Sequence, residues 1–178
     1  MGKQYETITV EQEDQIEWLS VNRRGKLNAI SPLMCDELQD YFLGLQRRHE
    51  VRVVIMKGNG RHFCAGYDIH DAEGVSQGPV EGMRFQRQVS EVILRMRYCP
   101  QPIINLAQGA ATGGGLAFAL ASDVRIGAEN VKFNVAMVKI GLTGCDVGIS
   151  YFLPRAIGQS MAAEMMMTGR MVHADRAL

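Results

Sequence analysis

The sequence predicts an α/β fold with a mostly parallel sheet. Two observations lead to this prediction. Short apolar runs rich in β-branched residues alternate along the chain with longer stretches whose apolar residues recur every three or four positions. In addition, a strand, a glycine-rich turn and a helix are expected in succession twice, after Met56 and again after Ala107. Because strands that alternate with helices are usually linked by crossover connections, we expect them to lie parallel.

Length and composition are those of one globular domain, which we take to span residues 1–178. Of the 178 residues, 47% are hydrophobic, enough to form a sizeable core. Nineteen Lys and Arg balance nineteen Asp and Glu, and this zero net charge argues against a nucleic-acid partner. The four cysteines lie 29, 35 and 46 residues apart, so their spacing suggests neither a metal site nor a disulfide framework.

No segment of the sequence is typical of a membrane protein. Residues 1–13 are polar and lack the apolar segment of a signal peptide. The longest apolar stretch, 116–121, is much shorter than the roughly 20 residues that span a bilayer. We therefore expect a cytoplasmic protein that has no membrane partner.

The N-terminal third predicts a hairpin, a helix and a strand. Alternating segments at 5–10 and 16–21 indicate a β-hairpin with a turn at Glu13-Asp14. Ser31-Pro32 is typical of a helix start, because a hydroxyl N-cap precedes a proline at the first helical position. Four residues of this helix are expected to be buried: Met34, Leu38, Phe42 and Leu45. Residues 51–56 then form an apolar, β-branched run that indicates a buried strand.

The middle of the chain predicts a loop, a long helix and a strand. The polar, glycine-containing stretch 68–82 is expected to be a mobile surface loop. A helix at 80–98 should end before Pro100. The side chains expected to face the core are Met83, Val89, Val92, Ile93 and Met96. Residues 102–107 indicate a strand and 109–115 a turn.

The C-terminal third continues the alternation with shorter elements. The expected elements are a helix at 116–121, a strand at 123–128, an extended segment at 131–135, a loop at 141–148 and partly helical structure at 149–157. A last helix at 160–168 is expected to end at Gly169, since glycine is the preferred residue after a helix C-terminus.

Two glycine-rich turns are the best candidates for chemistry: F-C-A-G-Y-D-I at 63–69 and G-A-A-T-G-G-G-L at 109–116. Glycine lets the backbone approach a ligand closely, and the first amides of a following helix have no partner within that helix. Such turns suit a phosphate or a developing oxyanion. Neither turn matches a known phosphate-loop motif. Tight packing of helix on sheet, without a ligand, is the alternative interpretation.

These turns resemble those of the crotonase, or enoyl-CoA hydratase/isomerase, superfamily. Four further motifs occur in the family's order and spacing: R-R-G-K-L-N-A-I at 23–30, A-S-D-V-R-I at 121–126, L-P-R-A-I-G at 153–158 and T-G-R at 168–170. The resemblance implies a spiral of ββα turns. It also implies a homotrimer or hexamer for a full-length chain, and we expect the family's C-terminal trimerisation helices to be missing after residue 178.

The resemblance further implies an enzyme, a lyase or isomerase, that binds an acyl-CoA thioester. Its carbonyl oxygen would be held by the backbone amides of Tyr67 and Gly114, which stabilise an enolate more than the ground state. Six residues would bind the CoA moiety: Gly25, Lys26, Leu27, Ala65, Asp68 and Ile69. Lys26 would face a CoA phosphate or be a solvated loop lysine. No metal and no cofactor beyond CoA is implied.

The sequence departs from the family at the two hydratase glutamates. The corresponding positions hold Ala117 and Met137, and neither side chain can transfer a proton. Standard hydration by two glutamates is therefore not expected.

Asp146 is the remaining candidate acid/base, at a position where the resemblance implies an aspartate in dienoyl-CoA isomerase-like members. Burial among apolar neighbours would raise its pKa. The alternative is that Asp146 only caps a helix. We accordingly expect double-bond isomerisation or a related proton transfer. Acyl-CoA binding without catalysis is one alternative, and hydrolysis of a thioester or β-diketone on the same fold is another.

Overall fold

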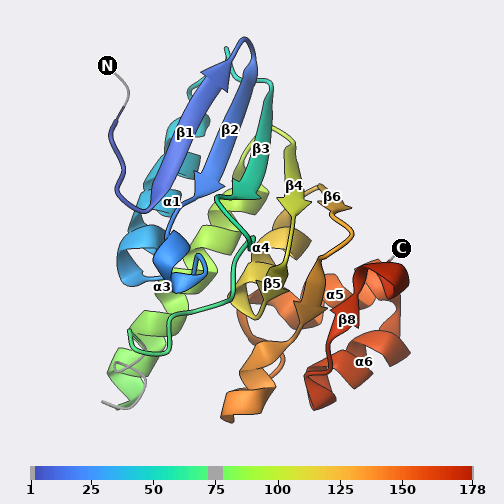
Figure 1. Ribbon diagram of the computed structural model, residues 1–178. Helices are drawn as coiled ribbons and strands as arrows, with labels where there is room; N and C mark the ends of the chain where they lie inside the picture. The colour runs from blue at the N-terminus through green and yellow to red at the C-terminus, as the bar shows by residue number, and fades with distance from the viewer. Residues whose placement is uncertain (1–2, 72–77, 178) are drawn as a thin grey trace.

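A five-stranded sheet forms the first layer of the protein. The computed structural model describes residues 3–71 and 78–177. The strand order is β1-β2-β3-β4-β6, and the strands lie side by side in Figure 1. Their bounds are β1 (Ile8–Glu13), β2 (Ile16–Val21), β3 (Val53–Gly58), β4 (Ile103–Ala107) and β6 (Val124–Gly127). Strands β1 and β2 form the expected antiparallel hairpin, and all other pairs are parallel, which confirms the α/β prediction.

A second, smaller sheet consists of β5 (Ala110–Thr112), β7 (Lys132–Asn134) and β8 (Val172–His173). Single bridging pairs extend its ladder toward the N-terminus: Ile30 pairs with Tyr67, and Cys64 pairs with Ala111. Each turn of the chain therefore adds one strand to the large sheet and one short extended segment to the small one. This arrangement is the predicted ββα spiral.

The helices follow these strand pairs. The α-helices are α1 (Pro32–Leu45), α3 (Pro79–Tyr98), α4 (Gly114–Ala121), α5 (Ile149–Ile157) and α6 (Gln159–Thr168). The 3-10 helices are η1 (Arg24–Lys26), η2 (Ala136–Ile140), η3 (Asp146–Gly148) and η4 (Ala174–Arg176). Helix α3 packs against both α1 and α4, while α5 packs against α4 and α6. In Figure 1, α1 and α3 lie behind β1–β3, and α5 and α6 gather near the C-terminus.

The helix boundaries follow the local signals in the sequence. The Ser31 hydroxyl accepts a hydrogen bond from the Met34 amide, so Ser31 is the N-cap of α1 as expected. All four predicted core residues of α1 are buried. Gly169 takes a left-handed conformation directly after α6, as expected for a C-terminal stop.

Three expectations need correction. Met83 is 68% exposed rather than inward, because the buried face of α3 begins only at Val89. The predicted loop 68–82 is shorter than expected, since α3 already begins at Pro79; residues 72–77 lie outside the described part of the chain. The predicted turn 109–115 contains the strand β5 and the start of α4.

Within residues 3–71 and 78–177, no helix combines the length and the apolar character that crossing a membrane requires.

Candidate functional site

The two glycine-rich turns lie side by side. Each turn follows a segment of the small sheet, and these two segments pair with each other up to the turns. The Cys64 amide donates to the Ala110 carbonyl, and the Thr112 amide donates to the Cys64 carbonyl. The Thr112 hydroxyl adds a bond to the Ala65 carbonyl at 2.9 Å. Beyond these contacts each of the two segments turns at a glycine with positive φ, Gly66 at 97° and Gly113 at 54°. A side chain at either position would be strained, so the opening depends on glycine.

The Tyr67 amide borders this opening. On one side of Tyr67, the Gly66 carbonyl accepts from the Ile30 amide at 2.8 Å; on the other, the Asp68 amide donates to the Ile30 carbonyl at 2.9 Å. Successive amides of an extended segment point in opposite directions. The Tyr67 N–H therefore points away from Ile30, and among the described residues it donates to no protein acceptor.

The Gly114 amide lies on the facing turn. Gly114 is the first residue of α4, so its N–H has no partner within the helix and lies at the positive end of the helix dipole. A methyl group placed on the Gly114 Cα would lie 3.9 Å from the Tyr67 nitrogen. One on the Gly66 Cα would lie 3.6 Å from the Gly114 nitrogen. Two donors this close together suit a single oxygen atom that carries negative charge.

Apolar side chains lie beside the two glycine turns. A methyl group on Gly114 would meet the Ile30 Cδ1 at 2.6 Å, and one on Gly113 would lie 3.9 Å from the Met137 Sδ. Ala117 is buried one turn further along α4. The two positions at which the resemblance implies glutamates thus lie next to the glycine turn, and in this chain both hold apolar side chains.

The six residues expected to bind CoA come from two adjoining segments. Gly25, Lys26 and Leu27 are exposed in and after η1, and the Leu27 carbonyl accepts a hydrogen bond from the Ala65 amide at 3.2 Å. Ile69 is 63% exposed on the second segment. The structure therefore brings the two segments together at the surface, next to the amide of Tyr67.

Asp68 differs from the other five, because its side chain is buried. One carboxylate oxygen lies 3.2 Å from Nη2 of Arg23, and the other accepts the His70 amide at 3.2 Å. The carboxylate is therefore engaged within the protein. The Asp68 amide also donates to the Ile30 carbonyl, and the Asp68 carbonyl accepts the Asp71 amide.

Asp146 contacts α3 rather than either glycine turn. It is half-buried in η3, and desolvation raises its pKa from the ordinary aspartate value, although a hydrogen bond from Gln86 of α3 opposes this shift. The neighbouring residue on α3, Phe85, packs edge-to-face on the Tyr67 ring with 4.4 Å between the ring centroids. Among the described residues, Asp146 makes no hydrogen bond to the segments of Tyr67 or Gly114. The structure thus brings Tyr67 and Gly114 together, and α3 contacts both Tyr67, through Phe85, and Asp146, through Gln86.

The capping interpretation of Asp146 does not fit the structure. The N-cap of α5 is Gly148, and no side chain caps this helix. Val147, between them, has a left-handed backbone with φ of 46°, an unusual conformation for a β-branched residue. Strained backbone of this kind is frequent at functional sites.

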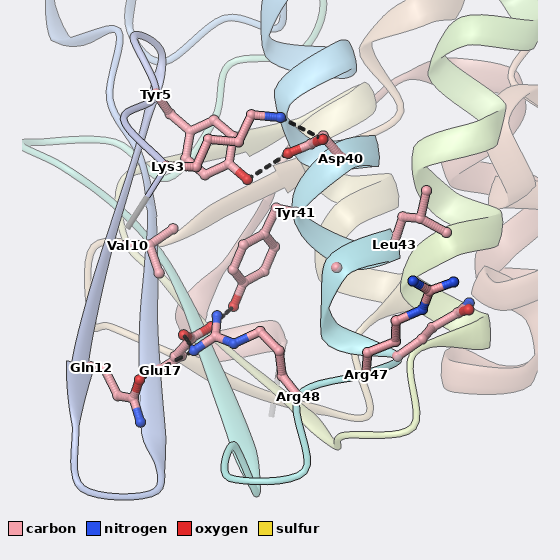
Figure 2. A pocket seen from close by; sticks show the side chains of 12 residues that line it. Lys3, Tyr5, Val10, Gln12, Glu17, Asp40, Tyr41, Leu43, Arg47 and Arg48 are labelled. Atoms are coloured by element: carbon pink, nitrogen blue, oxygen red, sulfur yellow. Dashed lines mark hydrogen bonds and ion pairs between the residues drawn. The ribbon is translucent and has the colours of Figure 1, made fainter. Parts of the chain in front are cut away.

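A cavity of about 710 Å³ lies elsewhere, between the β1–β2 hairpin and α1 (Figure 2). Four of its five charged lining groups pair with one another. Asp40 binds Lys3 at 2.6 Å and accepts the Tyr5 hydroxyl at 2.7 Å, while the buried Glu17 pairs with Arg48 and accepts the Tyr41 hydroxyl at 2.8 Å. Because these groups satisfy each other, the cavity indicates a polar brace between hairpin and helix rather than a site for chemistry.

Arg23, Asn28 and Gln86 contact the candidate site region but were not among the predicted site residues. Buried Asn28 accepts the Arg23 amide and donates to the carbonyls of Asn59 and His62, which organises the loop before α1. The available signal for Arg23 and Asn28 was their place in the motif at 23–30. Gln86 carries no local signal, because its partner Asp146 is distant in the sequence.

A sequence profile of the enoyl-CoA hydratase/isomerase family matches residues 11–178. The chain is 38% identical over 169 residues to a probable enoyl-CoA hydratase of Mycobacterium leprae, a match that covers 92% of this chain and 57% of the relative. It is 32% identical over 161 residues to 1,2-epoxyphenylacetyl-CoA isomerase of Escherichia coli, covering 89% of this chain and 61% of that enzyme. The chain thus spans about three fifths of the length of these curated relatives.

A solved enoyl-CoA hydratase from Shewanella pealeana has the same fold. The two structures align with a TM-score of 0.92 at 26% identity, over 98% of this chain and 66% of the hydratase.

Proposed function

The chain belongs to the enoyl-CoA hydratase/isomerase family, and we propose that it binds an acyl-CoA thioester and stabilises its enolate with the amides of Tyr67 and Gly114. The observation that carries this proposal is the proximity of two N–H groups that donate to no acceptor among the described residues. One such donor typically contributes about 3–4 kcal/mol to stabilising a developing oxyanion.

The proposed reaction moves a double bond along the acyl chain. The Asp146 carboxylate removes a proton from a carbon next to the unsaturation, and the electron pair moves to the thioester oxygen, where the two amides hold it. The same carboxylic acid then returns the proton to another carbon, so that the product is an isomer of the substrate. The raised pKa of Asp146 supports this role, because a carboxylate that is costly to keep ionised is a stronger base.

Hydration by two glutamates is not part of the proposal. Ala117 and Met137 line the glycine turn and cannot activate water. The relatives include proteins named as hydratases and one named as an isomerase, so the family name alone does not choose between these reactions.

The direct test mixes the protein with crotonyl-CoA or with a 3,5-dienoyl-CoA and follows the absorbance of the conjugated thioester. We expect turnover of the diene, its loss in Asp146→Asn, and no hydration of crotonyl-CoA. Asp175→Asn is the matched control, because it removes an exposed carboxylate from η4.

Four outcomes would contradict the proposal. Rapid hydration of crotonyl-CoA would show that Ala117 and Met137 do not exclude hydration. Diene turnover that survives Asp146→Asn would remove Asp146 from the mechanism. Tight binding of acyl-CoA without turnover of any ester would favour the non-catalytic alternative, and release of free CoA would favour hydrolysis.

We further propose that the CoA part of the substrate is the only cofactor-like group, held at the surface segments of Gly25–Leu27 and Ala65–Ile69. Isothermal titration with CoA, with and without added EDTA, tests whether a metal contributes to binding. By its family resemblance, a full-length chain is proposed to form a homotrimer or hexamer, which sedimentation would reveal.

A further inference from the structure

Arg23 joins the two segments that border the candidate site. Its Nη1 donates to the Ala29 carbonyl at 2.7 Å, and its Nη2 lies 3.2 Å from the Asp68 carboxylate and 3.8 Å from that of Asp71. The Arg23 side chain is only 20% exposed and that of Asp68 only 6%. One guanidinium therefore ties the loop before α1 to the segment after the first glycine turn.

This contact is geometrically well defined. The Arg23 amide donates to the Asn28 side chain at 2.8 Å, and the Arg23 carbonyl accepts the amides of Lys26 and Asn28. These hydrogen bonds within its own loop fix the backbone of Arg23, and its side chain extends from there to Asp68. A planar guanidinium with several donors loses less freedom per hydrogen bond than a flexible lysine would.

Tyr67 lies between the groups that Arg23 holds. The residue after it, Asp68, is bound through its side chain to Arg23 and through its amide to Ile30. The residue before it, Gly66, is bound to Ile30 through its carbonyl. Ile30 itself follows Ala29, whose carbonyl accepts from Arg23. The peptide that presents the Tyr67 N–H is therefore held on both sides by a network that includes Arg23.

We propose that Arg23 is a positioning residue for the Tyr67 amide: through Asp68 it fixes the direction in which that N–H points into the opening beside Gly114. This inference rests on the proposed function, since the direction of the N–H matters only if an oxyanion binds there. A misplacement of about 1 Å at a reacting centre can lower a rate about 100-fold. Loss of the guanidinium is therefore expected to act on the rate without removing any group that touches the substrate.

The test compares Arg23→Met with Arg97→Met. Arg97 is a matched control, because its Nη1 also donates to a backbone carbonyl, that of Ala121, and to an aspartate, Asp123, both at 2.9 Å. Arg97 lies at the end of α3, its partners lie at and just after the end of α4, and neither glycine turn is among its contacts. Arg23→Lys and Asp68→Asn provide milder variants, in case Arg23→Met fails to fold.

The first measurement is amide hydrogen exchange of the free protein. We expect exchange at residues 64–71 to rise about 10-fold or more in Arg23→Met and Asp68→Asn, less in Arg23→Lys, and not in Arg97→Met. Because no substrate is present, this result does not depend on the proposed function. Unchanged exchange at 64–71 in all three site variants would overturn the inference.

The second measurement uses a conjugated enoyl-CoA, whose absorbance band moves to longer wavelength when its carbonyl is polarised. We expect a smaller band shift in Arg23→Met than in the unaltered protein, and a kcat for the diene lowered about 10- to 100-fold. The affinity for CoA without an acyl group, which has no carbonyl to polarise, should fall by a smaller factor than kcat does.

The two measurements separate the two claims. If exchange rises but the band shift and kcat stay at their original values, Arg23 braces the loop without positioning the amide, and the inference is wrong. If the unaltered protein polarises no enoyl-CoA, the proposed function is wrong. Hydrogen exchange would then still decide whether Arg23 holds the segment.

Discussion

Substituting Gly115 by alanine tests whether the two glycine turns must lie as close as the structure places them. Gly115 is the second residue of α4, and a Cβ at this position would lie 2.2 Å from the Cys64 carbonyl oxygen and 2.8 Å from the Cys64 Cβ. Both neighbours belong to the segment that pairs with β5, so a rotamer change cannot relieve the overlap. The α4 N-terminus and the 64–67 segment have to move apart, by roughly 1 Å for ordinary contact.

Two losses follow from this movement. Overpacking typically lowers the free energy of unfolding by about 1–3 kcal/mol, and a clash with backbone belongs at the upper end. For a chain of this size each kcal/mol lowers the melting temperature by about 2–4 °C. Separation of the two amides by about 1 Å would in addition lower the proposed isomerase kcat about 100-fold.

Gly44→Ala is the matched control. Gly44 lies near the end of α1, where an added Cβ would meet nothing within 4 Å. Alanine is favoured over glycine in a helix by about 0.5–1 kcal/mol, so this variant should be slightly more stable and unchanged in activity. Thermal unfolding and diene turnover measured on both variants make the comparison. A Gly115→Ala protein with unaltered stability and kcat would refute the close approach of the two turns.

Three further predictions concern stability. Burial raises the pKa of Asp146, so the folded chain binds a proton there more tightly than the unfolded chain. Protonation of Asp146 therefore stabilises the folded state at low pH. This stabilisation is lost as the pH rises from the ordinary aspartate pKa through the raised one. Asp146→Asn should therefore gain stability relative to the unaltered protein as the pH rises above about 4, as measured by urea unfolding; a constant difference would contradict the shift. Tyr41→Phe removes the hydroxyl that donates to buried Glu17, so the free energy of unfolding should fall by about 1.5–3 kcal/mol while diene turnover is unchanged. Ser31→Ala removes the side-chain cap of α1 and should lower the free energy of unfolding by about 1 kcal/mol. Ser31→Asn keeps a capping oxygen and should retain most of this stability.

Local signals in the sequence predicted α1 well, because its start and its buried face are both determined by neighbouring residues. Ser31 and Pro32 define where the helix can begin, and the spacing of Met34 and Leu38 defines which face is apolar. The same reasoning was wrong for Met83. Periodicity shows which side of α3 is apolar but not how far the helix extends beyond its partners.

The candidate site depended on contacts that no local pattern contains. Each glycine turn was recognisable by itself, but their proximity results from the pairing of Cys64 with Ala111 across the small sheet. Only the family resemblance linked Tyr67 to Gly114 beforehand. The Arg23–Asp68 ion pair could not be predicted from spacing, since a charged residue in a loop is solvated unless the tertiary structure supplies a partner.

The single bridging pairs of the small sheet also have a consequence for the order in which the chain folds. Tyr67 and Gly114 belong to successive turns of the spiral, so a chain in which only the hairpin and α1 have folded does not yet bring the two amides of the proposed oxyanion site together. Contacts between residues this distant in sequence form late, because loop closure must precede them. A ligand that requires both amides would bind only after the second turn has docked, and would shift the equilibrium toward that state by mass action. Ligand binding during refolding would therefore report when consecutive turns of the spiral come into register.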